Sequence, residues 1–196
     1  MGRSENQFAQ AIDFYLEPSR ATLRAEIAAI ARQPQSQQTD ALLLGYAMEG
    51  IRLAGTFGSY RQASRADEIT EDDGRSVAVP AGARVFVSFV SAARDPARFP
   101  APDEVNPRRD LGAYIHYGFG PHACLGRSAS QIAIVEMFRA LFRKRNLCRA
   151  PGAAGELKKV ARPGGFYVYM KEDWGSLWPF PVSMKVQWDD EDGAAE

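Results

Sequence analysis

Side chains that could bind a metal are concentrated in one glycine-rich stretch, residues 114–128, which reads YIHYGFGPHACLGRS. The stretch holds both histidines of the chain, His116 and His122, and one of its two cysteines, Cys124. Three kinds of site could explain it: a structural cysteine packed in a core, a nucleotide loop that binds phosphate, or a thiolate that binds a metal. The residues around the stretch have to distinguish these possibilities.

The nucleotide interpretation rests on residues 118–123, GFGPHA, which fit the looser G-x-G-x-x-(G/A) fingerprint. That fingerprint also needs a second strand that ends in an acidic residue about 20 positions further on. The acid at that distance, Glu136, falls in the middle of the predicted helix, and the segment after this helix, KRNLCRA, contains none. The loop therefore lacks the context that nucleotide binding requires.

The glycines favour a thiolate over a packed cysteine. Free cysteine is among the most buried residue types, so a structural role for Cys124 is the general alternative. A packed cysteine does not need glycines on both sides, whereas Gly118, Gly120 and Gly126 let bare backbone approach a ligand. We expect Cys124 at or just before a helix start, where free N–H groups and the helix dipole favour an anionic sulfur. The pattern indicates a thiolate that holds a metal against a flat ligand.

The hydrophobic pattern predicts a largely helical frame for this loop. Helices are expected near residues 8–16, 20–32, 41–55 and 126–144. Thr39 or Asp40 is the expected cap of the third helix, and Gly55 its end. The last helix is apolar around most of its circumference, which predicts a place in the middle of the fold.

Short strands and one irregular segment complete the expected elements. Strands are expected at residues 60–63, 77–79 and 85–89, the last two joined as a hairpin by Pro80-Ala81-Gly82. Residues 94–110 contain four prolines, so regular structure is not expected there. Residues 166–170 and 183–188 are expected to be closing strands.

Composition narrows the class of partner and compartment. Lysine plus arginine and aspartate plus glutamate number 24 each, so no basic excess points to nucleic acid. The arginines and lysine in residues 139–149 are expected to be a solvated helix end. Two cysteines make no disulfide framework, and their spacing with the histidines fits no zinc pattern. With no signal core and no transmembrane segment, we expect a cytoplasmic protein, with peripheral association with membranes or lipid bodies as the alternative.

At this point the loop resembles the haem-binding signature of the cytochromes P450. The residues that carry the resemblance are Tyr117, Gly118, Gly120, His122, Cys124 and Gly126, with Tyr117 where phenylalanine is usual. The resemblance implies that Cys124 is the axial thiolate ligand of the iron of haem b. It also implies that His122 faces a haem propionate.

A second motif, Glu49-x-x-Arg52, resembles the ExxR of the family's K helix. Alone, such a helical pair is usually a surface pair that contributes about 0.2–0.5 kcal/mol. Here VAVPAGARVFVS and RDPARFPAPDEVNPRRD follow it, in the family's order of hairpin and meander. The resemblance implies that Arg109 completes a structural Glu–Arg–Arg cluster, which fixes the meander behind the haem loop.

Three segments, residues 49–63, 110–126 and 173–189, are similar to the P450-like C-terminal half of the fungal linoleate diol synthases, or psi-factor-producing oxygenases. The resemblance runs from about residue 6 to residue 190. It implies that a separate haem dioxygenase domain makes a fatty-acid hydroperoxide. The P450-like domain would then isomerise this hydroperoxide to a diol without reductase or NADPH.

Amide side chains near the N-terminus extend this resemblance. Monooxygenases carry an acid–alcohol pair on the long helix over the iron, whereas this chain has Asn6, Gln7 and Gln10. These are similar to an Asn/Gln motif of the diol synthases, which implies a catalytic role in positioning the hydroperoxide or assisting cleavage of its O–O bond. The alternative is that they are polar residues of a frayed terminus.

We therefore expect residues 1–188 to form the C-terminal half of a P450-like haem domain, mainly α with small β sheets and incomplete as a single chain, and residues 189–196 to form an acidic disordered tail. The expected partners are an unsaturated fatty acid or its hydroperoxide, and a polypeptide that supplies the other P450 half and the dioxygenase domain. A haem held from one side should bind weakly and leave apolar surface exposed. A monooxygenase fragment that needs a reductase and a haem-free interaction or remnant protein are the alternatives.

Overall fold

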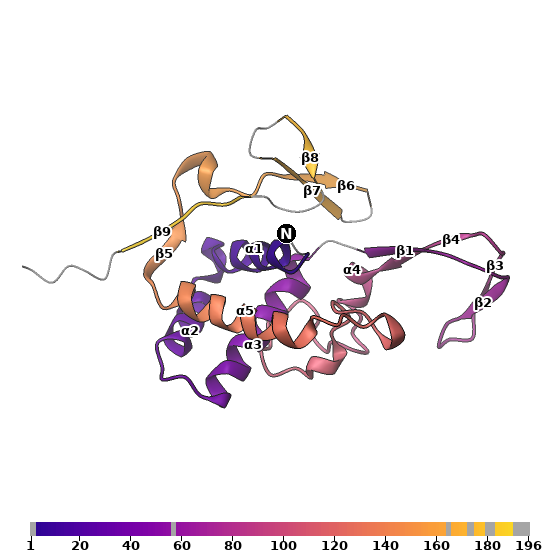
Figure 1. Ribbon diagram of the computed structural model, residues 1–196, viewed down its shortest axis with the longest axis horizontal. Coiled ribbons are helices and arrows are strands. Elements are labelled where there is room, and N and C mark those ends of the chain that lie inside the picture. Colours follow the sequence, from indigo (N-terminus) through magenta and orange to yellow (C-terminus); the bar gives the residue numbers. More distant parts are fainter. Residues whose placement is uncertain (1–2, 56–57, 164–165, 172–174, 179–182, 190–196) are drawn as a thin grey trace, which may run out of the picture.

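The structure, a computed structural model, describes the backbone of residues 3–55, 58–163, 166–171, 175–178 and 183–189, and most of their side chains from residue 7 onward (Figure 1). Its α-helices are α1 (Arg3–Tyr15), α2 (Ala21–Ala31), α3 (Gln37–Ala54), α4 (Phe89–Ala92) and α5 (Arg127–Phe142). Short strands form small antiparallel sheets around these helices. The prediction of a mainly α chain with small β sheets is confirmed.

The predicted helices are present, and their ends follow local sequence signals. Helix α1 gives way to a 3-10 turn at Pro18–Arg20, because proline cannot continue a helix. The cap of α3 differs from the prediction: Ser36 is the cap, and its Oγ accepts from the Thr39 N–H at 3.2 Å. Thr39 Oγ1 accepts in return from the Ser36 N–H at 3.0 Å, which completes a capping box. Gly55 ends the helix as predicted.

The core lies where α1, α2, α3 and α5 meet. Tyr15 of α1 is fully buried there, and its hydroxyl donates to the Tyr46 carbonyl of α3 at 2.6 Å. A Cβ on Gly50 would come within 2.9 Å of the Ala11 Cβ, so the missing side chain lets α1 and α3 pack closely. The ring of Tyr15 packs edge to face on Phe138 and on Phe142 in the same core.

Helix α5 does not lie in the middle of the fold, contrary to the prediction. Ile134 and Phe138 are buried in the core, but Ile132 and Met137 on other sides of the helix are 67% and 38% exposed. The helix therefore covers one side of the bundle. Arg139 was predicted in a solvated helix end, but it is buried, because it forms an ion pair with Asp40 of α3.

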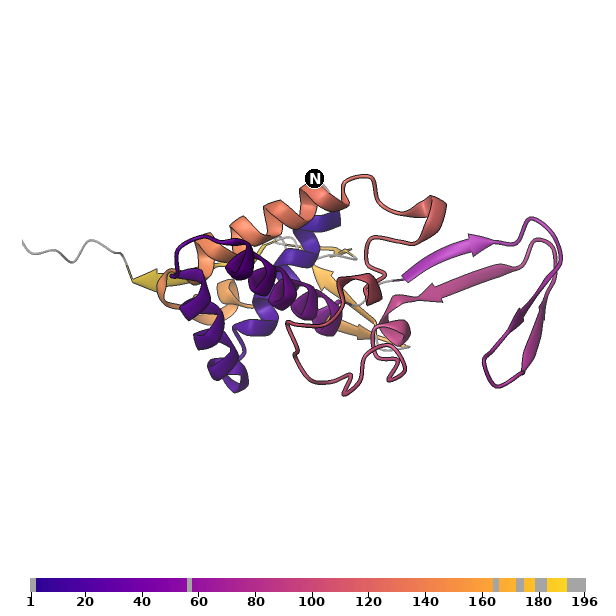
Figure 2. The same cartoon turned by 90° about the horizontal axis from the view of Figure 1, so that it is seen from below.

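The strands after α3 pair in a way that the sequence did not reveal. Strand β1 (Gly58–Gln62) pairs with β4 (Arg84–Ser88), and β2 (Asp67–Thr70) pairs with β3 (Ser76–Val79). The predicted hairpin between residues 77–79 and 85–89 is wrong. The backbone of Ala63 forms hydrogen bonds with Gly82 and Ala83, so residues 80–83 make a bend and not a hairpin turn. The true reversal lies at Glu71–Gly74, where Gly74 has φ +82°. The resulting long ribbon projects from the helices (Figure 2).

The last strands lie on the α1 side of the helices (Figure 1). Strand β5 (Arg145–Arg149), which was not predicted, pairs with β9 (Val186–Asp189), and β6 (Lys159–Arg162), β7 (Phe166–Met170) and β8 (Leu177–Trp178) form a three-stranded sheet. The buried Asp13 of α1 pairs with Arg149 at 2.7 Å and Lys159 at 2.5 Å, so β5 and β6 are both tied to this helix.

The meander agrees with its predicted character, whereas the start of the predicted tail does not. Residues 94–110 contain no helix or strand, as predicted for the meander. Asp189, assigned by sequence to the tail, pairs with Arg145 in the β5–β9 sheet, and residues 190–196 lie outside the described residues. Over the described ranges, no helix is long and apolar enough to cross a bilayer.

Candidate functional site

The glycine-rich loop folds into a tight turn just before α5. The Cys124 N–H donates to the Tyr117 carbonyl at 2.7 Å and closes the loop. Gly118 has φ +77°, and a Cβ there would come within 2.5 Å of the His122 carbonyl oxygen. Gly120 has φ +57°, and nothing lies within 4 Å of its Cβ position. Its backbone conformation, and not a lack of room for a side chain, therefore favours glycine there. Both glycines are thus needed to place Cys124.

The thiol of Cys124 is exposed. It is a free cysteine, and the Cβ position of Gly126 lies 3.7 Å from its Sγ, so no side chain from that residue crowds the sulfur. Phe119 is 86% exposed on the same loop, and Leu125 is fully exposed beside the cysteine. The alternative of a cysteine packed in a core is therefore wrong. An exposed thiol between exposed apolar side chains is instead suited to a large apolar ligand.

Two polar side chains of the loop, His122 and Tyr117, lie close to the sulfur in sequence. His122 is exposed and ends a 3-10 turn at Gly120–His122. Tyr117 is half-buried, and its pKa is raised by burial and then by its proximity to Cys124. Among the described residues, no group of three or more histidine, cysteine, aspartate or glutamate side chains could hold a metal ion. A metal at this loop would therefore rely on one sulfur ligand and a cofactor.

Glu49 lies at the centre of a buried polar cluster that joins α3 to the meander. Its carboxylate accepts from Arg52 Nε at 2.7 Å and Nη2 at 2.9 Å, and from Arg109 Nε at 3.3 Å. The Tyr114 hydroxyl donates to Oε1 at 2.6 Å, and the Asn106 N–H to Oε2 at 2.9 Å. Burial alone raises the pKa of Glu49, but the hydrogen bonds from Arg52 and Tyr114 outweigh it and hold the pKa below its usual range. Glu49 is therefore an anion in the fold.

The two arginines of the cluster organise the backbone of the meander. Arg52 Nη1 donates to the carbonyls of Ala93 at 2.8 Å and Pro102 at 2.5 Å. Arg109 donates to the carbonyls of Pro100 at 2.7 Å and Ala101 at 3.0 Å. These carbonyls belong to irregular chain that cannot satisfy them internally, so the guanidinium groups replace a regular hydrogen-bond ladder. The cluster fixes the path of the meander.

Two residues of the glycine-rich stretch to which the sequence assigned no role, Tyr114 and His116, connect this cluster to the cysteine loop. Tyr114 links Glu49 to the start of the loop segment, and its ring lies 5.7 Å from that of His116. Burial, followed by repulsion from Arg52, lowers the pKa of His116 to about 4, although a hydrogen bond to the Ile51 backbone opposes this shift. The buried His116 Nδ1 has no hydrogen-bond partner among the described residues. Their only signal in sequence was proximity to the glycine-rich loop.

The amides of α1 are partly described. The side chain of Asn6 lies outside the described residues. Gln7 and Gln10 are 9% and 3% exposed, so they are not the solvated polar residues of a frayed end. Gln10 Nε2 donates to the Tyr169 hydroxyl of β7 at 2.6 Å, which fixes the amide between the helix and the C-terminal sheet.

Comparison with known proteins defines the class of this chain. Residues 9–143 match the family model of cytochrome P450, which is more than half of the chain. The chain therefore belongs to the cytochrome P450 family. The heme domain of CYP116B5 from Acinetobacter radioresistens superposes with a TM-score of 0.66 at 20% identity, over 95% of this chain and 38% of that one. The P450 heme domain of Tepidiphilus thermophilus gives a TM-score of 0.61 at 26% identity, over 80% and 34%.

Several fungal oxygenases are similar to this chain in sequence. A bifunctional dioxygenase–epoxy alcohol synthase of Pyricularia oryzae is 69% identical over 94% of this chain and 16% of its own length. The enzyme of the same name from Fusarium oxysporum is 65% identical over 93% and 14%. The linoleate diol synthase of Gaeumannomyces graminis is 30% identical over 92% and 19%. The chain thus spans less than a fifth of these relatives and resembles their P450-like part.

Proposed function

We propose that this chain forms the haem-thiolate site of a fungal fatty-acid oxygenase, and that it isomerises a fatty-acid hydroperoxide. The observation that carries the proposal is the free, exposed Cys124 on a loop shaped by two left-handed glycines. The identity of 69% with a dioxygenase–epoxy alcohol synthase supports it. We place residues 1–188 in this haem domain.

The residues of the loop fit a haem. A single soft thiolate suits iron, and open space at Gly120 with exposed Phe119 and Leu125 leaves an apolar surface for a flat macrocycle. In this proposal Cys124 would hold the iron, and His122 would donate to a propionate. Helix α5 begins at Arg127, so its dipole favours negative charge on the sulfur. Haem bound here would supply the redox-active iron that cleaves an O–O bond.

The reaction needs no external reductant. An unsaturated hydroperoxide and its epoxy alcohol are isomers: the O–O bond and one carbon–carbon double bond break, and two C–O bonds form. The oxygen that stays on its carbon closes the epoxide, and the other oxygen becomes a hydroxyl on carbon. The chain's own part is to orient the hydroperoxide, and we assign this to the amides of Asn6, Gln7 and Gln10. An amide donates and accepts hydrogen bonds without titrating, unlike a carboxylic acid. The bond from Gln10 to Tyr169 uses one amide N–H and would keep the group oriented.

The choice of product follows from the comparisons. The sequence resemblance implied diol synthesis, and the Gaeumannomyces graminis diol synthase is 30% identical to this chain. The two epoxy alcohol synthases are 69% and 65% identical, so we propose the epoxy alcohol as the main product and the diol as the second candidate. Their names include a dioxygenase, and we propose that such an activity supplies the hydroperoxide.

The test is turnover of a linoleate hydroperoxide by the haem-loaded chain, with products identified by mass spectrometry. We expect an epoxy alcohol without NADPH, and at least a hundredfold lower rate for Cys124→Ala, because its removal takes away the iron ligand (about 3 kcal/mol of barrier). Cys148→Ala is the matched control, since Cys148 is the second free cysteine and lies in β5. Turnover that needs NADPH and a reductase would instead establish a monooxygenase.

A further inference from the structure

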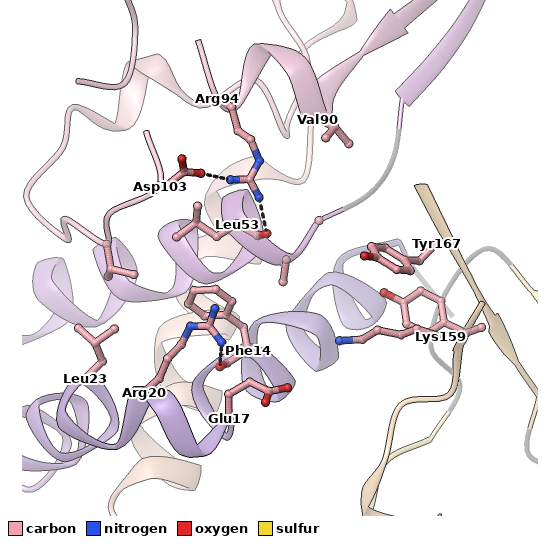
Figure 3. A pocket seen from close by; sticks show the side chains of 14 residues that line it. Phe14, Glu17, Arg20, Leu23, Leu53, Val90, Arg94, Asp103, Lys159 and Tyr167 are labelled. Carbon is pink, nitrogen blue, oxygen red and sulfur yellow. Dashed lines mark hydrogen bonds and ion pairs between the residues drawn. The ribbon is translucent and has the colours of Figure 1, made fainter. Parts of the chain in front are cut away.

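A cavity of about 770 Å³ opens between the turn from α1 to α2, the end of α3, helix α4 and the β6–β7 strands (Figure 3). None of its described lining residues belongs to the Cys124 loop. Its volume lies within the range of small-molecule sites, roughly 300–1,000 Å³. The cavity is therefore large enough for a ligand and is separate from the residues assigned to the haem.

The cavity wall combines apolar and aromatic side chains with charged ones. Phe14 and Leu23 line one side, Leu53 and Val90 another, and Tyr167 the side formed by the β6–β7 strands (Figure 3). These side chains come from five separate elements, so the apolar lining is a product of the fold and not of one exposed helix face. Such a wall suits the hydrocarbon part of a ligand.

The charged groups of the cavity are paired, with one exception. Arg94 pairs with Asp103 at 2.6 Å, and Lys159 pairs with Asp13 at 2.5 Å. Glu17 pairs with Arg149 at 2.6 Å. These pairs leave little net charge for a ligand to meet.

Arg20 is the exception. Its guanidinium has no ion-pair partner within the described part of the chain. It lies 3.7 Å from the centre of the Phe14 ring, and Nη1 donates to the Phe14 carbonyl at 3.3 Å. These contacts orient the planar group at the cavity and use one of its five N–H donors. A fixed guanidinium with free donors suits a carboxylate, which it can bind through two hydrogen bonds.

We propose that this cavity binds a long-chain monocarboxylate, with the carboxylate on Arg20 and the hydrocarbon chain against the apolar wall. One uncompensated positive charge matches a single negative charge. The inference rests on the proposed function for the identity of the ligand as the fatty-acid substrate. Tyr169 lines the cavity and also accepts the hydrogen bond from Gln10, so one wall of the cavity adjoins the amide assigned to the hydroperoxide.

The test is binding of the fluorescent fatty acid cis-parinaric acid to the haem-free 196-residue chain. We expect its Kd to rise about tenfold in Arg20→Gln, because the charge-assisted hydrogen bonds are lost, and to rise less in Arg20→Lys, which keeps the charge but not the planar pair of donors. Arg24→Gln is the matched control: Arg24 is also half-buried and bonds to the carbonyls of Tyr15 and Glu17 at the same turn, but it does not line the cavity.

Two further measurements keep the result unambiguous. Linoleyl alcohol, which lacks the charge, should displace the probe equally well from the wild type and Arg20→Gln. Val90→Trp, which fills the cavity from α4, should abolish binding of both acid and alcohol. The inference is overturned if the wild type does not bind the acid, if Arg20→Gln binds it normally, or if Arg24→Gln loses as much. Haem titration of Arg20→Gln should match the wild type. A failure of the fatty-acid cavity can therefore be told apart from a failure of the haem site.

Discussion

At the scale of single residues, the site combines positions that local sequence specifies with contacts that it does not. Gly118 and Gly120 have positive φ. Glycine adopts this conformation readily, so its presence in a tight loop is a local signal that can be read from the sequence. The bond from Tyr114 to Glu49 joins positions 65 residues apart, so no local pattern contains it. Cys124 could therefore be found from sequence, whereas the full set of Glu49 partners needed the fold.

His116 predicts a stability change with pH. Its pKa is about 4 in the fold against an ordinary 6.5, so the folded state disfavours the protonated ring. The stabilisation is complete above pH 6.5 and is lost as pH falls towards 4, by about 2 kcal/mol between pH 7 and pH 5. Urea unfolding at both pH values measures it. His116→Gln should lack this part of the pH dependence, and an unchanged dependence would contradict the assigned pKa.

At the scale of elements, the helices were predictable and the strand pairing was not. The apolar spacing of α1, α2 and α3 is a local signal, and the structure contains all three. Pro80-Ala81-Gly82 has the composition of a hairpin turn, yet β4 pairs with β1 across a long sequence separation. Helix α5 was placed too deep, because an apolar helix can cover one side of a core and still expose Ile132.

Helix α3 holds the meander through Glu49, which predicts a large effect of removing that charge. Glu49→Gln leaves Arg52 buried without its counter-ion, so we expect a loss of about 3–5 kcal/mol in the free energy of unfolding. Glu71→Gln is the control, since Glu71 forms an exposed pair with Arg75 in the ribbon and should cost under about 1 kcal/mol. A loss for Glu49→Gln as small as that for Glu71→Gln, measured by urea unfolding, would show that the Glu49 cluster does not stabilise the fold.

At the scale of the whole molecule, the chain belongs to the P450 family, covers only part of its relatives, and exposes large apolar side chains. It covers 38% of the CYP116B5 heme domain and 16% of the Pyricularia oryzae enzyme. Large apolar side chains are exposed at Tyr60 and Val77 on the ribbon and at Phe119 and Leu125 beside the cysteine. We expect haem to cover the second of these surfaces.

The most direct test of the central claim is an absorption spectrum of the chain with haem, reduced under carbon monoxide. A thiolate ligand predicts a strongly red-shifted Soret band in the wild type and in Cys148→Ala, and its loss in Cys124→Ala. The same red-shifted band in Cys124→Ala, or its absence from all three proteins, would contradict the assignment of Cys124 as the haem ligand of this chain.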